Sequence, residues 1–454
     1  MILGAGISGL SLGWYLKRRF GNKIRLTILE QTDRVGGWIQ TEQIEGCLFE
    51  TGPRSLRSKG SGLETLKLIE QLRLQSDVIA ASSSAKHRYL WSGQKLRKLP
   101  SGPISLLMSP LTRTAPFAAM KELFVKKSML SDESISSFMT RRFGRHYAES
   151  LLDPLTTGIY AGDTHKLSIR SCFPSLYEWE RDFGSVCRGM LLKRRPARRA
   201  RSPFQEQISR APIFSFKDGM ETLPNALGDA LSSHLEYNST VAKLHSSPNE
   251  IEVELTDGTK ITADHLFSTI PAAKLAPLFK DQHRELSSLL MSITCASVAV
   301  VRLGYFRKVM KKKGFGYLIP SCEKERILGC VFDSAVFPDQ NQIPEETRLT
   351  VMIGGTRNPS AVNDSKENLK MLALNSLEKH LGVDAEPDAV SVRIARSAIP
   401  QYFVGHMEKI DRIGTILARI YPRMTLTGNS FLGVSVNDCI ANSKRIVESL
   451  VLKP

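Results

Sequence analysis

Long apolar runs are absent from the 454-residue sequence. A helix that spans a membrane needs about 20 consecutive, mostly apolar residues. The nearest approach, at 289–301, is shorter and contains Ser292, Thr294 and Ser297. Internal repeats and low-complexity tracts are also missing, and the length exceeds that of a typical single domain. We therefore expect a globular chain of two or three domains that does not span a membrane.

Closely spaced cysteines are missing as well. The seven cysteines are scattered with no C-x-x-C pair, and the nine histidines show no metal-ligand spacing. A dispersed, odd set of cysteines argues against a disulfide framework and for a reducing compartment. We therefore expect neither disulfides nor a dedicated metal site. Because the first residues already have the pattern of a strand, we also expect no signal or transit segment and an intracellular protein.

Acidic residues are scarce relative to basic ones. The chain has 45 Asp and Glu against 62 Lys and Arg, for a net charge of +17. This excess favours an anionic partner, whether nucleic acid, acidic lipid or a polycarboxylate ligand. Part of it is concentrated in "KRRPARRARS" (193–202) and "FRKVMKKKG" (306–314). Solvated loops would carry the same runs, so the charge alone does not identify the partner.

A glycine loop, "GAGISG", follows the first three residues. Gly4, Gly6 and Gly9 have the G-x-G-x-x-G spacing, which allows a tight turn, close approach of the backbone to a pyrophosphate, and close packing of helix on strand. A helix over about 8–20 would direct its N-terminus at the phosphates. The three-residue lead is short for a strand, which typically has about five residues, so the first strand is expected to be short or to lack its outer part.

Two further features support a dinucleotide site. "KIRLTILE" predicts a strand that ends at Glu30, where a carboxylate can bind the hydroxyls of an adenosine ribose, which favours NAD or FAD over NADP. "DRVGGW" follows at once, with Arg34, Gly36, Gly37 and Trp38. A second glycine pair so soon after the acid is similar to the signature of FAD-binding flavoproteins with two dinucleotide-binding domains.

Later segments predict a discontinuous cofactor domain. "EIEVELTDGTKITADHLFSTIP" has alternating apolar residues on either side of an Asp257-Gly258 turn, which is typical of a hairpin. "MTLTGNSFLGVSVNDCIANSKRIVESL" begins as a strand and ends as a helix. We predict an α/β fold with an FAD-binding Rossmann-like domain at 1–80, 206–290 and 405–454. A mixed-sheet substrate domain is expected at 81–90 and 291–404, with a helical insertion at 91–205.

Six segments resemble the protoporphyrinogen oxidase family, in the branch typified by the animal mitochondrial enzyme. They are "FETGPRSLR" (49–57), "LSIRSCFPSLYEWE" (167–180), "GFGYLIPS" (314–321), "LTVMIGG" (349–355), "IPQYFVGH" (399–406) and "GVSVNDCI" (433–440). They occur in order along almost the whole chain. The resemblance implies an enzyme with non-covalent FAD that removes six electrons from a porphyrinogen, with oxygen as the usual acceptor and hydrogen peroxide as its product. It leaves a homodimer open.

The resemblance also assigns site residues. Those implied to contact FAD are Gly4, Ala5, Gly6, Ile7, Ser8, Gly9, Glu30, Gln31, Trp38, Gly52, Pro53, Arg54, Ser55, Val241, Asn429, Val434, Ser435 and Val436. Those implied to contact the tetrapyrrole are Arg88, Leu155, Gly158, Phe315, Leu318 and Met352. A reduced tetrapyrrole is a large apolar ring with propionates along one edge, so it needs apolar walls and a cation, which Arg88 supplies. No matched residue is assigned as an acid or base.

Some of these positions carry a second interpretation, and two positions depart from the family or adjoin an assigned residue. Arg54 either neutralises an FAD phosphate or caps a loop. Ser55 stands where relatives favour glycine after "GPR", and Pro154 precedes Leu155 and is expected to bend that end of the helix. Without the resemblance, Phe315, Leu318 and Met352 would be interpreted as core residues, and Arg88, beside the apolar "YLW" run, as a structural ion-pair residue.

The insertion is the expected membrane contact. "ISLLMSPLTRTAPFAAMKELFVKK" (104–127) mixes bulky apolar side chains with cations, and the basic run 193–202 lies in the same region. A basic amphipathic segment can lie in an anionic membrane interface, although a helix packed on its own domain would have the same pattern. We expect peripheral attachment to the mitochondrial inner membrane in a eukaryote, or a location in the cytoplasm or on the cytoplasmic face of the inner membrane in a bacterium.

Other functions remain open at this level. Coproporphyrinogen oxidation, with four carboxylates on the substrate, would need more cations than Arg88. An amine oxidase would need an aromatic cage at the flavin, and the late segment offers only Phe431; a carotenoid desaturase on the same scaffold is a further alternative. A basic nucleic-acid-binding protein would need aromatic residues interleaved with the cations, which the two basic runs almost lack. We therefore expect no nucleic-acid partner.

Overall fold

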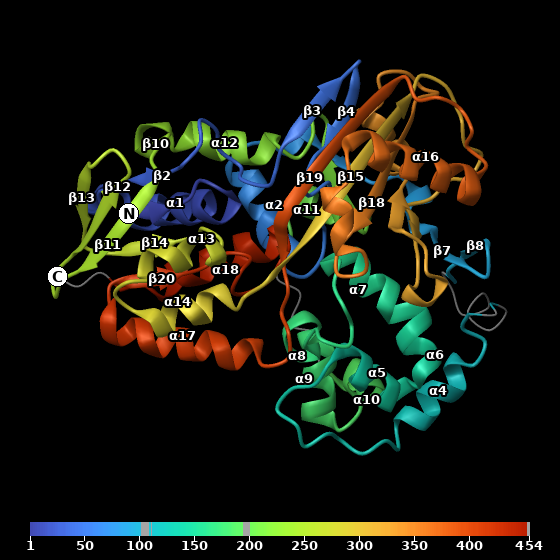
Figure 1. Cartoon of the computed structure of the whole chain (residues 1–454), viewed down its shortest axis with the longest axis horizontal. Helices are drawn as coiled ribbons and strands as arrows, with labels where there is room; N and C mark the ends of the chain where they lie inside the picture. Colours follow the sequence, from blue (N-terminus) through green and yellow to red (C-terminus); the bar gives the residue numbers. More distant parts are fainter. Residues whose placement is uncertain (101–108, 110, 194–199, 452–454) are drawn as a thin grey trace.

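The computed structural model describes residues 1–454 except 101–108, 110, 194–199 and 452–454. Figure 1 shows two sheet-based lobes, with a helical group beneath the second. The first lobe is built on a five-stranded sheet in the order β10 (Leu235–Glu236), β2 (Ile28–Leu29), β1 (Ile2–Leu3), β14 (Leu266–Ser268) and β20 (Met424–Leu426). All four strand pairs of this sheet are parallel, as expected of a dinucleotide-binding domain.

Alternate residues of this sheet enter two cores. Ile2 and Ile28 pack with α1 (Ile7–Phe20), α2 (Gly62–Gln71), α12 (Thr222–Ala230) and α18 (Val436–Ser449). Leu3 and Leu29 pack on the opposite side with α13 (Ala272–Leu275), α14 (Arg284–Met291) and α17 (His406–Ile420). Burial on both faces is why these strands have continuous rather than alternating apolar sequence. The predicted helix after the glycine loop and the predicted short first strand are both present.

The predicted hairpin is present beside this sheet. β12 (Ile251–Leu255) and β13 (Lys260–Ala263) pair antiparallel around Asp257 and Gly258, and Gly258 has a φ of +87°. β11 (Val241–Ser246) adds a third strand to this small sheet. The positive φ explains the glycine, because a residue with a side chain is strained there.

The second lobe contains a seven-stranded sheet. Its order is β19 (Ala389–Pro400), β15 (Cys295–Tyr305), β18 (Thr347–Gly354), β17 (Ile327–Val331), β16 (Gly316–Leu318), β7 (Arg88–Ser92) and β8 (Lys95–Lys98). Only β16 and β7 pair parallel, so the sheet is mixed, as predicted. α16 (Lys366–Leu381) packs on one face with α15 (Asp333–Val336) nearby.

The seven-stranded sheet continues past residue 90, where the first segment of the substrate domain was predicted to end. β7 continues to Ser92 and turns through Gly93 and Gln94 into β8. Both residues of this turn have positive φ, +59° and +56°. A tight hairpin keeps its two strands in one sheet, so residues 91–98 belong with the seven-stranded sheet and not with the helical insertion.

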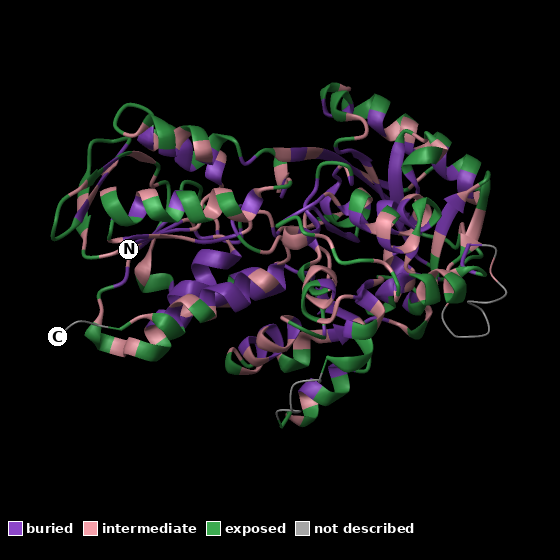
Figure 2. Cartoon of the chain, turned by 90° about the horizontal axis from the view of Figure 1, so that it is seen from below, coloured by how far each residue is buried: buried purple, intermediate pink, exposed green. Residues whose placement is uncertain are grey.

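Two small sheets join the lobes. One pairs β3 (Thr41–Ile44) with β4 (Cys47–Glu50), and β3 lies beside β19. The other has β9 (Ile213–Phe216) between β5 (Leu56–Arg57) and β6 (Val78–Ala80). Figure 2 shows the buried residues concentrated in the sheets and along the inner faces of the helices.

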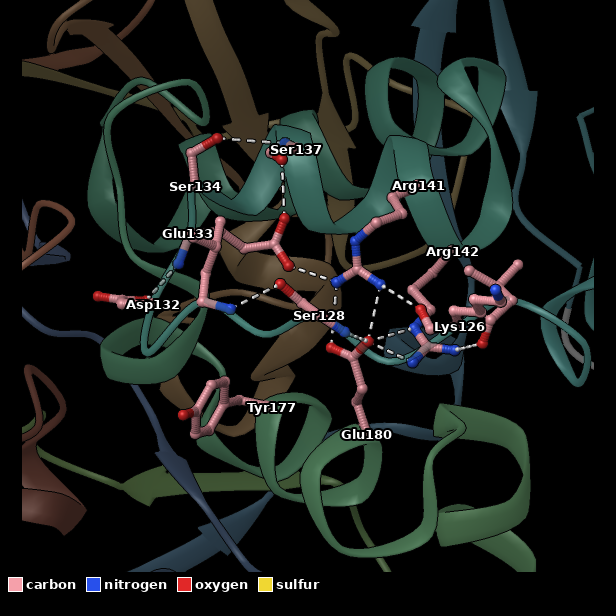
Figure 3. Close-up of polar contacts among 12 residues, drawn as sticks. Lys126, Ser128, Asp132, Glu133, Ser134, Ser137, Arg141, Arg142, Tyr177 and Glu180 are labelled. Atoms are coloured by element: carbon pink, nitrogen blue, oxygen red, sulfur yellow. Dashed lines mark hydrogen bonds and ion pairs between the residues drawn. The ribbon is translucent and has the colours of Figure 1, made fainter.

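The insertion is helical over its described part. Its helices are α4 (Ala115–Glu122), α5 (Ile135–Phe143), α6 (Arg145–Tyr147), α7 (Asp153–Tyr160), α8 (Ile169–Cys172), α9 (Pro174–Phe183), α10 (Val186–Leu192) and α11 (Pro203–Ile208), with a π-helical turn at Ala148–Leu152. Buried arginine–glutamate contacts hold α4, α5 and α9 together, and Figure 3 draws those between Arg141 and Arg142 of α5 and Glu180 of α9. No helix of the described residues is long and apolar enough to cross a bilayer.

Candidate functional site

The glycine loop lies where β1 ends and α1 begins. Gly4 has a φ of +96°, and a Cβ on Gly9 would stand 1.9 Å from the carbonyl oxygen of Gly4. Neither position can hold a side chain without moving the backbone. Gly6 differs, because among the described residues a Cβ there would meet only the Cα of Gly37, at 4.0 Å. The loop is therefore tightly packed at Gly4 and Gly9. At Gly6 it leaves space, and this is where an anion would lie.

The helix end that faces this opening offers free donors. Gly6 is the N-cap of α1, with no side-chain cap and no acidic residue in the first turn. The first N–H groups of a helix have no partner within the helix, and its N-terminus carries a partial positive charge. This combination fits the pyrophosphate of a dinucleotide.

Glu30 lies directly beside the loop and is almost fully buried. Its Oε2 accepts a hydrogen bond of 2.8 Å from the N–H of Ala5, and its Oε1 accepts bonds from the N–H and hydroxyl of Thr32. A carboxylate has about four acceptor positions, so capacity remains for ribose hydroxyls. Ser239 donates its N–H to the carbonyl oxygen of Glu30 at 2.8 Å, which brings the nearby Val241 toward the same end.

The second glycine segment is held by Arg34, a residue that was not among the predicted contacts. Its guanidinium donates to the carbonyl oxygens of Val35 at 2.9 Å and Gly37 at 2.6 Å, and pairs with Glu221 of the segment before α12 at 3.5 Å. Gly36 donates its N–H to the carbonyl of Ala5 at 2.9 Å. Arg34 thus closes this loop against the first one, a role that the "DRVGGW" motif signals but does not define.

The segment 50–55 lies beside the two glycine loops and forms the next part of the predicted cofactor-binding surface, which we call the cofactor wall. A Cβ on Gly52 would lie 1.9 Å from the carbonyl oxygen of Trp38, so these two segments are in backbone contact. Arg54 forms an ion pair of 3.2 Å with Asp333, and both side chains are mostly buried. This ion pair joins the loop to α15. Burial also raises the pKa of Glu50 to about 7, even though Met220 and Thr41 donate hydrogen bonds to its carboxylate.

The late segment completes this wall from the C-terminal side. Gly428 has a φ of +104° and lies against Thr269 and Ser8. The carbonyl oxygen of Asn429 accepts a hydrogen bond from the hydroxyl of Tyr402. Ser435 caps α18 by accepting from the N–H of Asp438. A second helix N-terminus therefore stands beside the first, and Ser443 of α18 donates to the carbonyl of Ser8.

A second, apolar wall belongs to the seven-stranded sheet. Met352 of β18 and Leu318 of β16 lie in register on either side of Gly329, where a Cβ would stand 2.4 Å from the carbonyl oxygen of Tyr317 and 3.2 Å from Leu318. Met352 packs in one apolar cluster with Trp38 and Ala161. This cluster joins the sheet to the "DRVGGW" loop, so the two walls meet.

Helix α7 covers this wall. A Cβ on Gly158 would approach the Cδ2 of Leu318 to 2.9 Å, so the helix lies directly on that side chain. Asp153, at the start of α7, accepts hydrogen bonds of 2.7 and 2.8 Å from the N–H and hydroxyl of Ser321. Arg357 donates to the carbonyl of Ile319 at 2.9 Å and lies 3.7 Å from Asp153. These contacts fix the helix over β16.

Pro154 and Leu155 lie in the first turn of α7. Proline is tolerated there because its missing N–H would have no helical partner. The predicted irregularity falls just before it, as the π-helical turn at Ala148–Leu152. Leu155 is 38 % exposed and lies one turn before Gly158 on the same helix face. It therefore extends the wall at the open edge of the helix.

Arg88 stands at the end of the apolar wall. It begins β7, pairs in register with Gly316, and places its guanidinium over the ring of Phe315, 5.4 Å from the centroid. Its side chain forms no ion pair with any described residue, and it is exposed. A guanidinium that lies over an aromatic ring and has no acidic partner is suited to a carboxylate. The six predicted substrate residues therefore lie along one surface: four line the apolar wall, and Phe315 and Arg88 lie at its end.

The geometry defines a dinucleotide-dependent oxidoreductase: a dinucleotide cradle between two helix N-termini, next to an apolar wall that ends in a free cation. Comparison with known proteins identifies the class. The flavin containing amine oxidoreductase family model matches residues 7–451. The chain is 36 % identical to protoporphyrinogen oxidase of Bos taurus, across 98 % of this chain and 96 % of that protein. It is 30 % identical to coproporphyrinogen III oxidase of Bacillus subtilis, with the same two coverages.

A solved structure from Exiguobacterium sp. 255-15 superposes with a TM-score of 0.81 at 25 % identity and covers 99 % of this chain and 97 % of that one. The chain belongs to the flavin-containing amine oxidoreductase family, and the family implies FAD. Within it, the chain is a porphyrinogen oxidase, similar to the protoporphyrinogen oxidases along its full length.

Proposed function

We propose that the protein oxidises protoporphyrinogen IX to protoporphyrin IX in haem biosynthesis, with non-covalent FAD as cofactor and oxygen as acceptor. The observation that carries this proposal is the apolar wall of Leu318 and Met352, which meets the cofactor loops at Trp38 and ends at Arg88. Removal of six electrons corresponds to three successive two-electron oxidations, each of which consumes one dioxygen and forms one hydrogen peroxide.

The cradle residues have defined tasks in this proposal. Glu30 binds the adenosine ribose, the open side of Gly6 and the first turn of α1 bind the pyrophosphate, and segments 52–55 and 434–436 border the flavin. When bound, FAD supplies the hydride acceptor, so the protein mainly holds donor and acceptor in place. Leu155, Leu318, Phe315 and Met352 exclude water and orient the macrocycle. Arg88 binds a propionate, and Gly158 lets the ring approach under α7.

The Arg88→Leu variant tests the substrate end. It should raise KM for protoporphyrinogen by at least about tenfold, because a charge-assisted hydrogen bond contributes about 1.5–3 kcal/mol. The FAD content of the purified protein should not change. The KM of Arg88→Lys should lie between those of wild type and Arg88→Leu, since a lysine keeps the charge but loses the forked geometry of the guanidinium. Steady-state porphyrin fluorescence measures this, and an unchanged KM in Arg88→Leu would remove Arg88 from the site.

A second candidate substrate is coproporphyrinogen III. The sequence argument for the dicarboxylate rested on Arg88 as the main cation. In the structure the basic run 306–314 continues into Gly314 and Phe315, beside the segment that leads to Arg88. This proximity favours a more carboxylated substrate than Arg88 alone would. Turnover of each porphyrinogen, supplied separately, distinguishes the two.

We also propose peripheral attachment to an anionic membrane through the insertion. Its described surface exposes Phe117, Met120, Phe124, Met129, Leu130, Met190, Leu191 and Leu192, next to the cations Lys121, Lys126 and Lys127. Large apolar side chains gathered in one region of a surface are typical of interaction sites. The predicted segment 104–127 and basic run 193–202 lie partly outside the described residues. The inner-membrane locations expected from the sequence are part of this proposal.

Flotation with anionic vesicles tests this surface. The double variant Phe124→Ser/Met129→Ser should lose flotation, because these side chains are 81 % and 95 % exposed and would enter the interface. Met371→Ser, at an equally apolar but distant exposed position on α16, is the matched control. About 1 M salt shortens the Debye length to about 3 Å and should weaken binding. If Phe124→Ser/Met129→Ser floats as well as Met371→Ser, this surface is not the membrane contact.

A further inference from the structure

Five cations gather at the end of the seven-stranded sheet where β7 begins. They are Lys86, Arg88, Lys311, Lys312 and Lys313, and all are exposed. None of them forms an ion pair with an acid in the part of the chain that the structure describes, whereas Arg307 of the same basic run pairs with Asp388 at 3.1 Å. Within the run 306–314, Arg307 therefore forms an ion pair that supports the fold, whereas Lys311, Lys312 and Lys313 form none with any described residue.

The segment 306–315, between β15 and β16, is held in place at both ends, and we call it the lysine loop. Val309 and Met310 pack against the apolar core beneath α16. The hydroxyl of Tyr89 donates to the carbonyl oxygen of Lys313 at 3.0 Å, and Phe315 donates its N–H to the carbonyl of His87 at 2.8 Å. Tyr89 and His87 are the two neighbours of Arg88 in sequence. The three consecutive lysines are thus held next to Arg88.

Contact with this strand also explains Gly314. A Cβ at this position would lie 2.6 Å from the carbonyl oxygen of His87 and 2.7 Å from the Cε2 of Tyr89. Only glycine allows the lysine loop to approach β7 so closely. Lys86 precedes His87 in the same segment and is exposed, so it lies two residues before Arg88 along the chain.

We infer that Lys86, Lys311, Lys312 and Lys313 form a lysine rim that captures one carboxylate of the tetrapyrrole while Arg88 binds another. The inference rests on the proposed function and names the group that recognises the second propionate. Exposed cations at the mouth of a site also attract anionic ligands over a distance, which accelerates association and makes it salt-dependent. Capture at the rim would bring the macrocycle edge-on to the apolar wall behind Phe315 and Leu318.

An anionic lipid would be attracted by the same charges. The substrate is favoured because the rim adjoins Arg88 and Phe315, whereas the apolar side chains suited to a bilayer lie on α4, α10 and the loop after α4. A membrane contact of the rim is therefore an alternative that the experiment must separate.

Equilibrium binding of protoporphyrin IX, followed by porphyrin fluorescence on the FAD-loaded protein, tests the rim. The variant Lys311→Gln/Lys312→Gln/Lys313→Gln should weaken binding by about tenfold at low salt, where steering by charge is strongest. Wild type should lose a similar factor between about 0.1 M and about 1 M salt, and the variant should lose little. The matched control is Lys23→Gln/Lys274→Gln/Lys280→Gln, which removes three exposed lysines far from Arg88.

A carboxyl-esterified probe completes the design. Protoporphyrin dimethyl ester has no carboxylate, so the rim variant and wild type should bind it equally. Equal binding of protoporphyrin IX by the two proteins at low salt would overturn the rim. Loss of flotation on anionic vesicles with unchanged porphyrin binding would instead assign the lysines to a membrane. If wild type binds neither porphyrin, the proposed function fails and not the rim alone.

Discussion

Replacement of Gly9 by alanine should abolish stable FAD binding. The new Cβ would stand 1.9 Å from the carbonyl oxygen of Gly4, and the loop cannot relax without moving Gly6 and the N-terminus of α1. We expect the affinity for FAD to fall by at least about 100-fold, or about 3 kcal/mol at about 1.4 kcal/mol per tenfold. Titration of apoprotein with FAD, followed by flavin fluorescence, measures the loss.

Gly414→Ala is the matched control for this variant. Gly414 lies in the middle of α17 and is exposed, and a Cβ there would meet no atom of the described part of the chain within 4 Å. Alanine is the better helix former by about 1 kcal/mol, so this change should leave FAD binding intact and stabilise the protein slightly. Full FAD affinity in Gly9→Ala would mean that the loop is not the pyrophosphate site.

Replacement of Arg142 by alanine should destabilise the insertion. Figure 3 shows Arg142 and Arg141 of α5 converging on Glu180 of α9. Arg142 donates to Glu180 at 2.8 Å and to Glu122 of α4 at 3.0 Å, and all three side chains are almost fully buried. Removal of one partner from a buried ion pair leaves an uncompensated charge and costs about 3–5 kcal/mol.

The effect should be local, because these contacts lie within the insertion. Hydrogen exchange of amides in α4, α5 and α9 should accelerate by at least about 100-fold, while exchange in the five-stranded sheet stays unchanged. Arg145→Ala is the control, since Arg145 pairs with Glu149 at the surface and should leave exchange as it is. Unchanged exchange in Arg142→Ala would show that the cluster does not hold the insertion together.

The cofactor half of the molecule could be predicted closely because its signals are local. The spacing of Gly4, Gly6 and Gly9 is typical of the tight turn of a dinucleotide-binding loop, and Glu30 follows at the end of an apolar strand. The Asp257-Gly258 turn likewise specifies its hairpin within a few residues. In each case the backbone requirement and the residue that meets it are neighbours in sequence.

The remaining features depend on partners far away in the chain. Arg54 could not be assigned because its partner, Asp333, is distant in sequence, and β8 could not be assigned because its place depends on pairing with β7. Arg34 was visible in its motif, but its hydrogen bonds to the carbonyl oxygens of Val35 and Gly37 and its ion pair with Glu221 were not. The lysines at 311–313 looked like a solvated run because nothing in the sequence brings them to Arg88.

The substrate half was reached through family resemblance, and the structure supplies its physical basis. Gly158 lies on Leu318, Gly329 separates Leu318 from Met352, and Phe315 supports Arg88. Without these contacts, three of the six residues would have been interpreted as core. The partial exposure of Phe315, Leu318 and Met352 distinguishes a wall of a site from the interior of a domain.

Anaerobic mixing of the FAD-loaded protein with protoporphyrinogen IX tests the account most directly. Flavin absorbance near about 450 nm should bleach within one turnover, and porphyrin fluorescence should appear and increase after air is admitted. Coproporphyrinogen III in a parallel experiment should bleach the flavin more slowly. Bleaching by neither porphyrinogen would contradict the proposed oxidation, and faster bleaching by coproporphyrinogen would reverse the choice of substrate.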